Sequence, residues 1–177
     1  MKKRKRTGFT LVELLITIAI ISIISIVVVM TLNPPEMLRQ ARDGSRLADM
    51  KTLNGVVGLY LNEFPNGGLG SNSTIYVSLP DKTLSGNATS TCASLGLPTP
   101  PTGYIYQCTS PQSYRDVDGT GWMPVNLKQM AEGSPIGDLP IDPSNVSSTG
   151  LYYMYATDGA SYVFTAIPES PSRSWRS

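Results

Sequence analysis

The sequence contains no histidine and only two cysteines among its 177 residues, and charged side chains make up only 15% of it. Histidine is the side chain most often used as a general base near neutral pH, and it is the commonest metal ligand. The sequence also has no zinc-type cysteine spacing and no phosphate-binding glycine loop. We therefore expect no catalytic residue and do not expect the protein to be an enzyme.

Basic residues are scarce beyond the start of the chain. Residues 2–6 hold five of the 14 Lys and Arg residues, so the remaining nine face 13 acidic residues, a formal net charge of −4. A nucleic-acid site needs clustered Lys and Arg to neutralise phosphates. The composition therefore does not indicate a nucleic-acid partner.

One long hydrophobic run follows the basic cluster. Residues 14–32 carry no charge and are mostly Ile, Leu and Val. At ~1.5 Å per residue, a helix of this length nearly spans the ~30 Å hydrocarbon core of a bilayer. Basic flanking segments stay in the cytoplasm, which places the rest of the chain outside. We therefore predict a single-pass protein of the inner or cytoplasmic membrane with its N-terminus in the cytoplasm.

The two cysteines, Cys92 and Cys108, both fall on the outer side of this predicted anchor. Disulfides persist outside the cytoplasm, and a bond closing a loop of this size stabilises a domain by about 3 kcal/mol in the chain-entropy description. We predict a Cys92–Cys108 disulfide; the alternative is two unrelated free thiols.

A carboxylate interrupts the start of the hydrophobic run. Burying Glu13 without a partner costs roughly 3 kcal/mol on insertion scales, unless it lies at the membrane interface and reaches water. Its surroundings, Lys-Arg-Thr-Gly-Phe-Thr-Leu-Val-Glu-Leu-Leu-Ile at residues 5–16, resemble the processing site of the type IV pilin and pseudopilin superfamily. The shared features are a short basic leader, Gly8 before the cut, Phe9 after it, and a Glu five residues into the mature chain.

This resemblance implies a processing and assembly pathway. Residues 1–8 would be a leader peptide that prepilin peptidase removes between Gly8 and Phe9, with methylation of the new Phe9 amine. Glu13 of one subunit would then meet the charged amino terminus of Phe9 on its neighbour and set the register of a filament. The implied partners are further copies of the chain, related minor pilins, prepilin peptidase, an assembly platform and an ATPase.

The predicted stalk has two parts. Residues 9–32 form the transmembrane and assembly helix, and residues 33–66 form an amphipathic helix that continues it beyond a break near Pro34 and Pro35. The apolar stripe of the second helix comprises Leu47, Met50, Leu53, Asn54, Val57, Tyr60, Leu61 and Phe64. The opposite face carries alternating charges and is expected to be solvated, at Arg39, Arg42, Asp43, Arg46 and Asp49.

Residues 67–177 are predicted to form an extracytoplasmic globular head. Strand-like patterns occur at residues 75–77 and 103–108, and residues 151–157 and 160–166 indicate a hairpin with a two-residue turn at Asp158-Gly159. We predict an α+β fold in which the long helix packs against a small antiparallel sheet.

Two segments resemble parts of calcium sites. Residues 139–145 are similar to the Asp-Pro stretch of the major pseudopilins of type II secretion, which hold calcium in the loop beyond it. The only nearby carboxylates here are Asp142 and Asp158, with Asp138 a little earlier, and the acidic extension of that family is missing after Ala166, so we expect no metal. The Asp-rich residues 116–121 lack the rest of an EF-hand loop and are predicted to form a solvated turn.

These features favour a structural subunit, either a pilin or a major-type pseudopilin, of a type IV pilus-like filament. The alternative is a membrane-tethered binding module or enzyme that uses the hydrophobic segment only as an anchor. A third reading is a minor subunit that primes assembly or sits at a filament tip, but retention of Glu13 favours a subunit of the filament body. The sequence leaves open which system is served: a retractable pilus for motility or adhesion, a secretion pseudopilus or a DNA-uptake filament.

Overall fold

The structure, a computed structural model, describes residues 8–170. Most of the predicted leader, residues 1–7, and the end of the predicted head, residues 171–177, lie outside this range. The chain divides into two compact units, Met1–Arg39 and Gln40–Ser177, and each is described by itself below.

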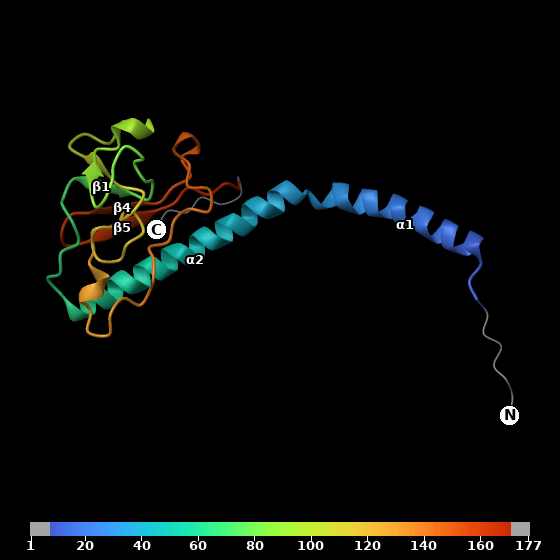
Figure 1. Cartoon of the computed structure of the whole chain (residues 1–177), viewed down its shortest axis with the longest axis horizontal. Helices are drawn as coiled ribbons and strands as arrows, with labels where there is room; N and C mark the ends of the chain where they lie inside the picture. The colour runs from blue at the N-terminus through green and yellow to red at the C-terminus, as the bar shows by residue number, and fades with distance from the viewer. Residues whose placement is uncertain (1–7, 171–177) are drawn as a thin grey trace, which may run out of the picture. The chain divides into compact units, whose positions relative to one another are not determined.

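The first unit is dominated by helix α1, Leu11–Leu32 (Figure 1). Thr10 caps its start, and it ends at Asn33, whose backbone is left-handed with φ of 45°. Asn is one of the few residues that tolerate this conformation. Helix α2, Pro34–Glu63, begins directly afterwards, with proline in a first turn where its missing N–H costs nothing. The predicted break near Pro34 and Pro35 is therefore confirmed.

The second unit contains most of α2 and a five-stranded sheet of order β2-β3-β1-β4-β5 (Figure 1). Its strands and 3-10 helices are β1 (Thr74–Val77), β2 (Thr89–Ser90), η1 (Ala93–Leu95), β3 (Ile105–Thr109), η2 (Leu127–Gln129), η3 (Ser147–Thr149), β4 (Met154–Thr157) and β5 (Tyr162–Thr165). Strands β4 and β5 form the predicted hairpin, and α2 packs on the sheet. The predicted α+β fold is confirmed.

The prediction of a purely antiparallel sheet is wrong for one strand pair. Strands β1 and β3 run parallel, with Ile75 opposite Tyr106. Parallel neighbours need a crossover of roughly a dozen residues or more, and residues 78–104 supply it with β2, η1 and irregular loops. That segment is rich in Gly, Ser, Thr and Pro, so its composition did not reveal the direction in which the chain returns.

The turn of the β4–β5 hairpin also differs from the prediction. Thr157 is paired with Tyr162, so four residues form the connection and not two. The Asp158 carboxylate accepts hydrogen bonds from the backbone N–H groups of Ala160 at 2.9 Å and Ser161 at 2.6 Å. This side-chain capping stabilises the wider loop in place of a two-residue primed turn.

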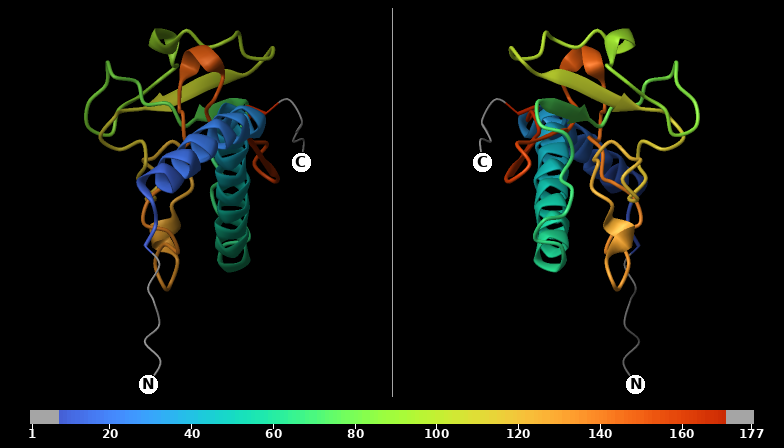
Figure 2. Two further views of the ribbon diagram at one scale, coloured as in Figure 1. Left: turned by 90° about the vertical axis from the view of Figure 1, so that its right-hand side faces the viewer. Right: turned by 90° about the vertical axis from the view of Figure 1, so that its left-hand side faces the viewer.

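The main core lies between α2 and one face of the sheet. Leu53, Val57 and Tyr60 of α2 are buried in a cluster with Tyr76 of β1 and Trp122. Val56 joins them, whereas Asn54 of the predicted stripe is exposed and Leu47 is half-buried. Figure 2 shows α2 running beneath the strands in both side views. The prediction of the apolar face of α2 is therefore correct, except that Val56 is buried and Asn54 is not.

A second, smaller core cluster contains the predicted disulfide. Cys92 and Cys108 are bonded, with their Cα atoms 5.3 Å apart, and both are buried with Val77, Leu79 and Tyr152. The bond joins the residue before η1 to β3 and closes the loop between them. The predicted disulfide is present.

Candidate functional site

The processing and assembly residues predicted from the sequence lie at the start of α1. Gly8 and Phe9 precede the helix in exposed chain without regular secondary structure, and Phe9 is 85% exposed. Apart from its two neighbours in the chain, no described residue comes within 4 Å of the place that a side chain at Gly8 would take. The bond between Gly8 and Phe9 is therefore accessible.

Glu13 forms a capping box with Thr10 at the start of α1. The Thr10 N–H and hydroxyl both donate to Glu13 Oε2 at 3.1 Å, and the Glu13 N–H donates to Thr10 Oγ1 at 3.2 Å. A free carboxylate in the first turn also interacts favourably with the helix dipole. Thr10 was not predicted as a cap, although Thr-x-x-Glu before an apolar run is the sequence signature of a capping box.

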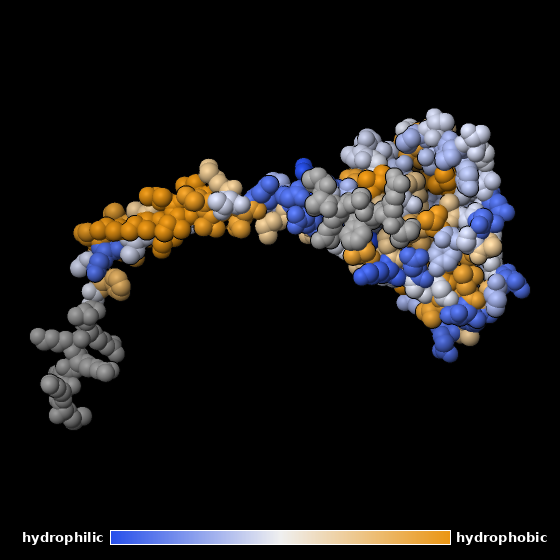
Figure 3. Space-filling view, turned by 180° about the vertical axis from the view of Figure 1, so that it is seen from behind, coloured by the Kyte–Doolittle hydropathy of each residue, from blue (hydrophilic) through white to orange (hydrophobic). Residues whose placement is uncertain are grey.

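The side chains of α1 make a surface that suits lipid or another apolar helix. None of its 22 residues is buried, and the face visible in Figure 3 is almost continuously hydrophobic. It is long and apolar enough to cross a membrane. Its polar side chains donate to backbone carbonyls of the same helix, from Thr17, Ser22, Ser25 and Thr31 at 2.7 to 2.9 Å. These hydroxyl groups therefore have hydrogen-bond partners within the helix. A hydrocarbon environment requires this, because it contains no water.

A buried ion cluster lies on the face of α2 that was predicted to be solvated. Arg46 is only 2% exposed, and its guanidinium contacts three carboxylates. It donates to Asp43 at 2.7 Å, to both oxygens of Asp142 at 2.6 and 2.8 Å, and to Glu169 at 2.7 Å. The prediction of a solvated face is wrong at Asp43 and Arg46, because partners 96 and 123 residues from Arg46 along the chain cover it.

The end of the described chain completes this cluster. Arg42 pairs with Glu169 through two hydrogen bonds, at 2.5 and 2.8 Å. Asp43 accepts hydrogen bonds from the N–H of Glu169, the N–H of Ser170 and the Ser170 hydroxyl, at 2.7 to 2.9 Å. We call Arg42, Asp43, Arg46, Asp142 and Glu169 the ionic clasp. It joins one turn of α2 to two segments far away in the sequence.

The hydrogen bonds of the clasp shift the ionisation of its carboxyl groups. Hydrogen bonds from Arg42 are the largest influence on the Glu169 carboxyl group. They outweigh its desolvation, so its pKa is lowered from 4.5 to about 2. Burial alone would raise the pKa of Asp43, but hydrogen bonds from Ser170, Glu169 and Arg46 lower it from 3.8 to about 2. The Arg46 pKa is raised, because its carboxylate partners outweigh desolvation. Asp43, Arg46 and Glu169 are therefore charged near neutral pH.

The clasp should make the head sensitive to acid. Because the Glu169 pKa falls from 4.5 to about 2 on folding, its contribution to stability is complete above pH 4.5 and is lost as the pH falls toward 2. This contribution is on the order of 3 kcal/mol, at about 1.4 kcal/mol per pKa unit. Urea unfolding of the full chain in detergent, followed by tryptophan fluorescence, should therefore show a lower unfolding free energy at pH 3 than at pH 6.

The matched control for this acid sensitivity is Glu169→Gln, which cannot titrate. The variant should lose less stability than the wild type between the same two pH values. It should keep part of the dependence, because Asp43 and Asp118 also have lowered pKa values. An identical pH dependence in both proteins would rule out Glu169 as a source.

The two candidate calcium ligands are occupied by protein groups. Both oxygens of Asp142 bind the Arg46 guanidinium, and Asp142 Oδ1 also accepts the Ser144 N–H at 2.8 Å. Asp158 caps its own hairpin turn. Within residues 8–170, no group of three or more His, Cys, Asp or Glu side chains is arranged to hold a metal ion.

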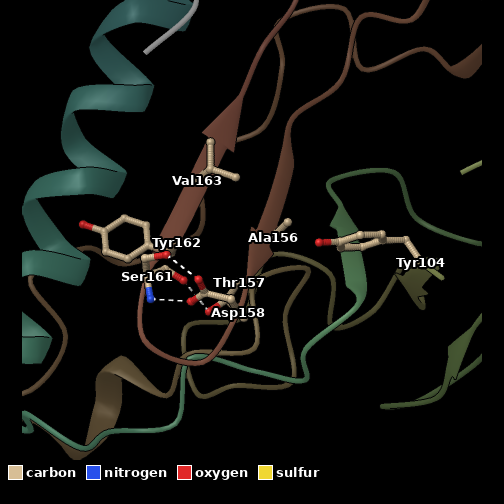
Figure 4. A pocket seen from close by; sticks show the side chains of 7 residues that line it. All are labelled: Tyr104, Ala156, Thr157, Asp158, Ser161, Tyr162 and Val163. Atoms are coloured by element: carbon tan, nitrogen blue, oxygen red, sulfur yellow. Dashed lines mark hydrogen bonds between the residues drawn. The ribbon is translucent and has the colours of Figure 1, made fainter. Parts of the chain in front are cut away.

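A shallow hollow lies beside this hairpin turn (Figure 4). Its lining consists of Tyr104, Ala156, Thr157, Asp158, Ser161, Tyr162 and Val163. The Asp158 carboxylate at its edge also accepts the Ser161 hydroxyl, at 2.8 Å. Its charged group therefore serves the turn, and the remaining lining is mostly apolar.

Comparison with known proteins bears on the N-terminal segment alone. The family model described as the prokaryotic N-terminal methylation motif matches residues 3–29. The match includes Gly8, Phe9, Thr10 and Glu13 together with most of α1. No curated protein and no solved structure matches the chain.

Proposed function

Starting from this prepilin-type signature, which supports assignment to the type IV pilin and pseudopilin family, we propose that the chain is a structural subunit of a type IV pilus-like filament. Prepilin peptidase removes residues 1–8 and methylates the Phe9 amine. The processed subunit waits in the membrane and then polymerises through α1. It acts as a building element of the filament body and not as a catalyst.

The observation that carries this proposal is the combination of an unburied apolar helix with one carboxylate at its start. Helix α1 buries none of its residues against the rest of the described chain. Transfer of such a helix from lipid into a helix bundle changes its apolar burial little, so packing and polar contacts must provide specificity. Glu13 is the one charged side chain in α1 and is therefore the natural source of that specificity.

The capping box suggests how Glu13 changes partner during assembly. In the described chain the Glu13 carboxylate bonds only to Thr10, whose N–H and hydroxyl are neutral donors. Cleavage after Gly8 creates a charged amine at Phe9, and hydrogen bonds that involve charged groups are stronger than neutral ones. We infer that Glu13 exchanges its bonds with Thr10 for a bond to the Phe9 amine of a neighbouring subunit. Desolvation offsets much of this gain, so the pair sets register more than it adds stability.

The disulfide supports the topology in this proposal. The Cys92–Cys108 bond is typical of an oxidising compartment outside the cytoplasm. The basic residues before α1 favour a cytoplasmic N-terminus. The second unit would accordingly face the periplasm or the exterior, first as a membrane-anchored head and then as part of a filament.

Replacing the residue before the cut tests this function. Gly8→Val should leave the leader attached. A branched side chain at this open, exposed position would hinder the peptidase at the bond that is cut. In cells of the native host, the variant should remain in the membrane fraction and be missing from filaments sheared from the surface. Immunoblotting of both fractions measures the outcome.

Gly137→Ala is the matched control, because a Cβ at Gly137 also meets no atom within 4 Å but lies in the head. It should be cleaved and assembled like the wild type. Filaments that contain Gly8→Val subunits with the leader attached would contradict the proposed processing. Absence of the wild-type chain from every filament fraction would contradict the proposed function itself.

A further inference from the structure

Residues 167–170 follow the last strand and cross the face of α2. They leave β5 after Thr165 and end with Ser170, which is only 3% exposed. Glu169 and Ser170 direct their hydrogen bonds to a single turn of α2 and to Ser144, whose hydroxyl lies 3.2 Å from Glu169 Oε1. We call residues 167–170 the strap.

The strap is held mainly by polar contacts. Ile167 at its start is 42% exposed, whereas the half-buried Glu169 carboxylate contacts Arg46 and the buried Ser170 hydroxyl contacts Asp43. Apolar burial is the dominant favourable term in folding, and a segment with little of it depends on its specific hydrogen bonds. The contacts of Glu169 and Ser170 therefore decide whether the strap lies on α2.

These contacts make closure of the strap close to all-or-none. Arg46 has almost no access to water, so removal of one carboxylate leaves a buried charge with fewer partners. Asp43 is fully buried and receives three of its hydrogen bonds from the strap, which it would lose together on opening. A partly open strap would leave buried charges unsatisfied, which disfavours intermediate positions.

The two hydrophobic cores of the second unit are formed without the strap. The main core around Trp122 and the disulfide cluster contain no strap residue. Proteins open locally in cooperative units whose free energies lie below that of global unfolding. A segment held at one end by a few charge-assisted hydrogen bonds is a natural unit of this kind.

We propose that the strap is a conformational latch that controls the order of the α2 turn at residues 40–47. With the latch closed, the turn is fixed to the head through Glu169, Ser170 and Asp142. With it open, the Asp142–Arg46 pair is the part of the clasp that still joins α2 to the head, and the turn exchanges between helical and frayed states while the sheet stays folded. The second unit begins with this turn. The latch therefore determines at which residue of α2 the ordered head begins.

Hydrogen–deuterium exchange of the full chain in detergent tests the latch, read by mass spectrometry on peptides of α2 and of the sheet. Glu169→Gln should speed exchange at residues 40–48 about tenfold or more, since hydrogen bonds to charged groups contribute enough stability for that factor. Peptides covering β1, β3, β4 and β5 should exchange more slowly than residues 40–48 in the wild type and in the variant, because they open only when the head unfolds. Ser170→Ala removes one neutral donor to Asp43 and should give a smaller increase confined to the same α2 peptide.

Asp138→Asn is the matched control. It also replaces a carboxylate by an amide, but in the exposed Arg115–Asp138 pair, where the closest N–O distance is 3.8 Å. It should leave exchange at residues 40–48 unchanged. The latch is refuted if Glu169→Gln leaves these residues as protected as in the wild type. It is equally refuted if residues 40–48 are as well protected as the sheet in both proteins, because the turn would then open only when the whole head unfolds. The proposed filament function is not tested by either result.

Discussion

Replacing Glu13 with Ala or Gln is expected to reduce filament assembly in cells by about tenfold to a hundredfold while leaving cleavage of the leader intact. The expected factor corresponds to the loss of one charge-assisted hydrogen bond per subunit, about 1.5–3 kcal/mol, at 1.4 kcal/mol per tenfold change. The measurement is the amount of the chain in filaments sheared from cells, relative to processed chain in the membrane.

The two substitutions separate the roles that the structure gives to Glu13. Gln serves as well as Glu at the third position of a capping box, so Glu13→Gln keeps the cap with Thr10 and loses only the charge. Glu13→Ala loses both. If Glu13→Gln assembles like the wild type and Glu13→Ala does not, capping of α1 is the role of this residue and pairing with the Phe9 amine is wrong. Glu132→Ala, at an exposed carboxylate of the head, should assemble normally.

Replacing Arg46 with Met should lower the unfolding free energy of the head by about 3–5 kcal/mol, since it leaves buried carboxylates without their cation. Asp43 and Asp142 are 0% and 1% exposed and would face an apolar side chain. Urea unfolding of the full chain in detergent measures the change, with the fluorescence of the buried Trp122 as the probe.

Arg39→Met is the control for Arg46→Met, on the same helix. Arg39 pairs with Glu36 at 3.6 Å with half of its side chain exposed, and exposed pairs contribute about 0–1 kcal/mol. The double variant Arg46→Met, Asp142→Asn should recover part of the loss, because it removes one of the buried carboxylates. A loss no larger for Arg46→Met than for Arg39→Met would contradict the buried clasp.

Local signals in the sequence were enough to predict the elements that depend on local physics. The uncharged run predicted α1, Pro34 and Pro35 predicted the break, and the alternating aromatic residues on either side of Asp158-Gly159 predicted the β4–β5 hairpin. The disulfide followed from topology, because only two cysteines were present on the outer side of the anchor. Each of these inferences needed only neighbouring residues or a single possible pairing.

Features that depend on distant partners could not be predicted. Arg46 and Asp43 have the spacing of a solvated helix face, and nothing near them in the sequence indicates that Asp142 and Glu169 cover them. The same applies to Asp142, which was the candidate calcium ligand in the Asp-Pro stretch but binds a guanidinium. The parallel pairing of β1 with β3 depends on the path of an irregular crossover. In each case the partner lies far along the chain and leaves no periodic pattern.

The most direct test of the central claim is an intact-mass measurement of the chain recovered from sheared surface filaments of its native host. The predicted mass is that of a chain that begins at Phe9, carries one methyl group on its amine and has Cys92 and Cys108 joined. A chain that retains residues 1–8, or that occurs only in the membrane and never in filaments, would contradict the claim and leave α1 as an ordinary membrane anchor.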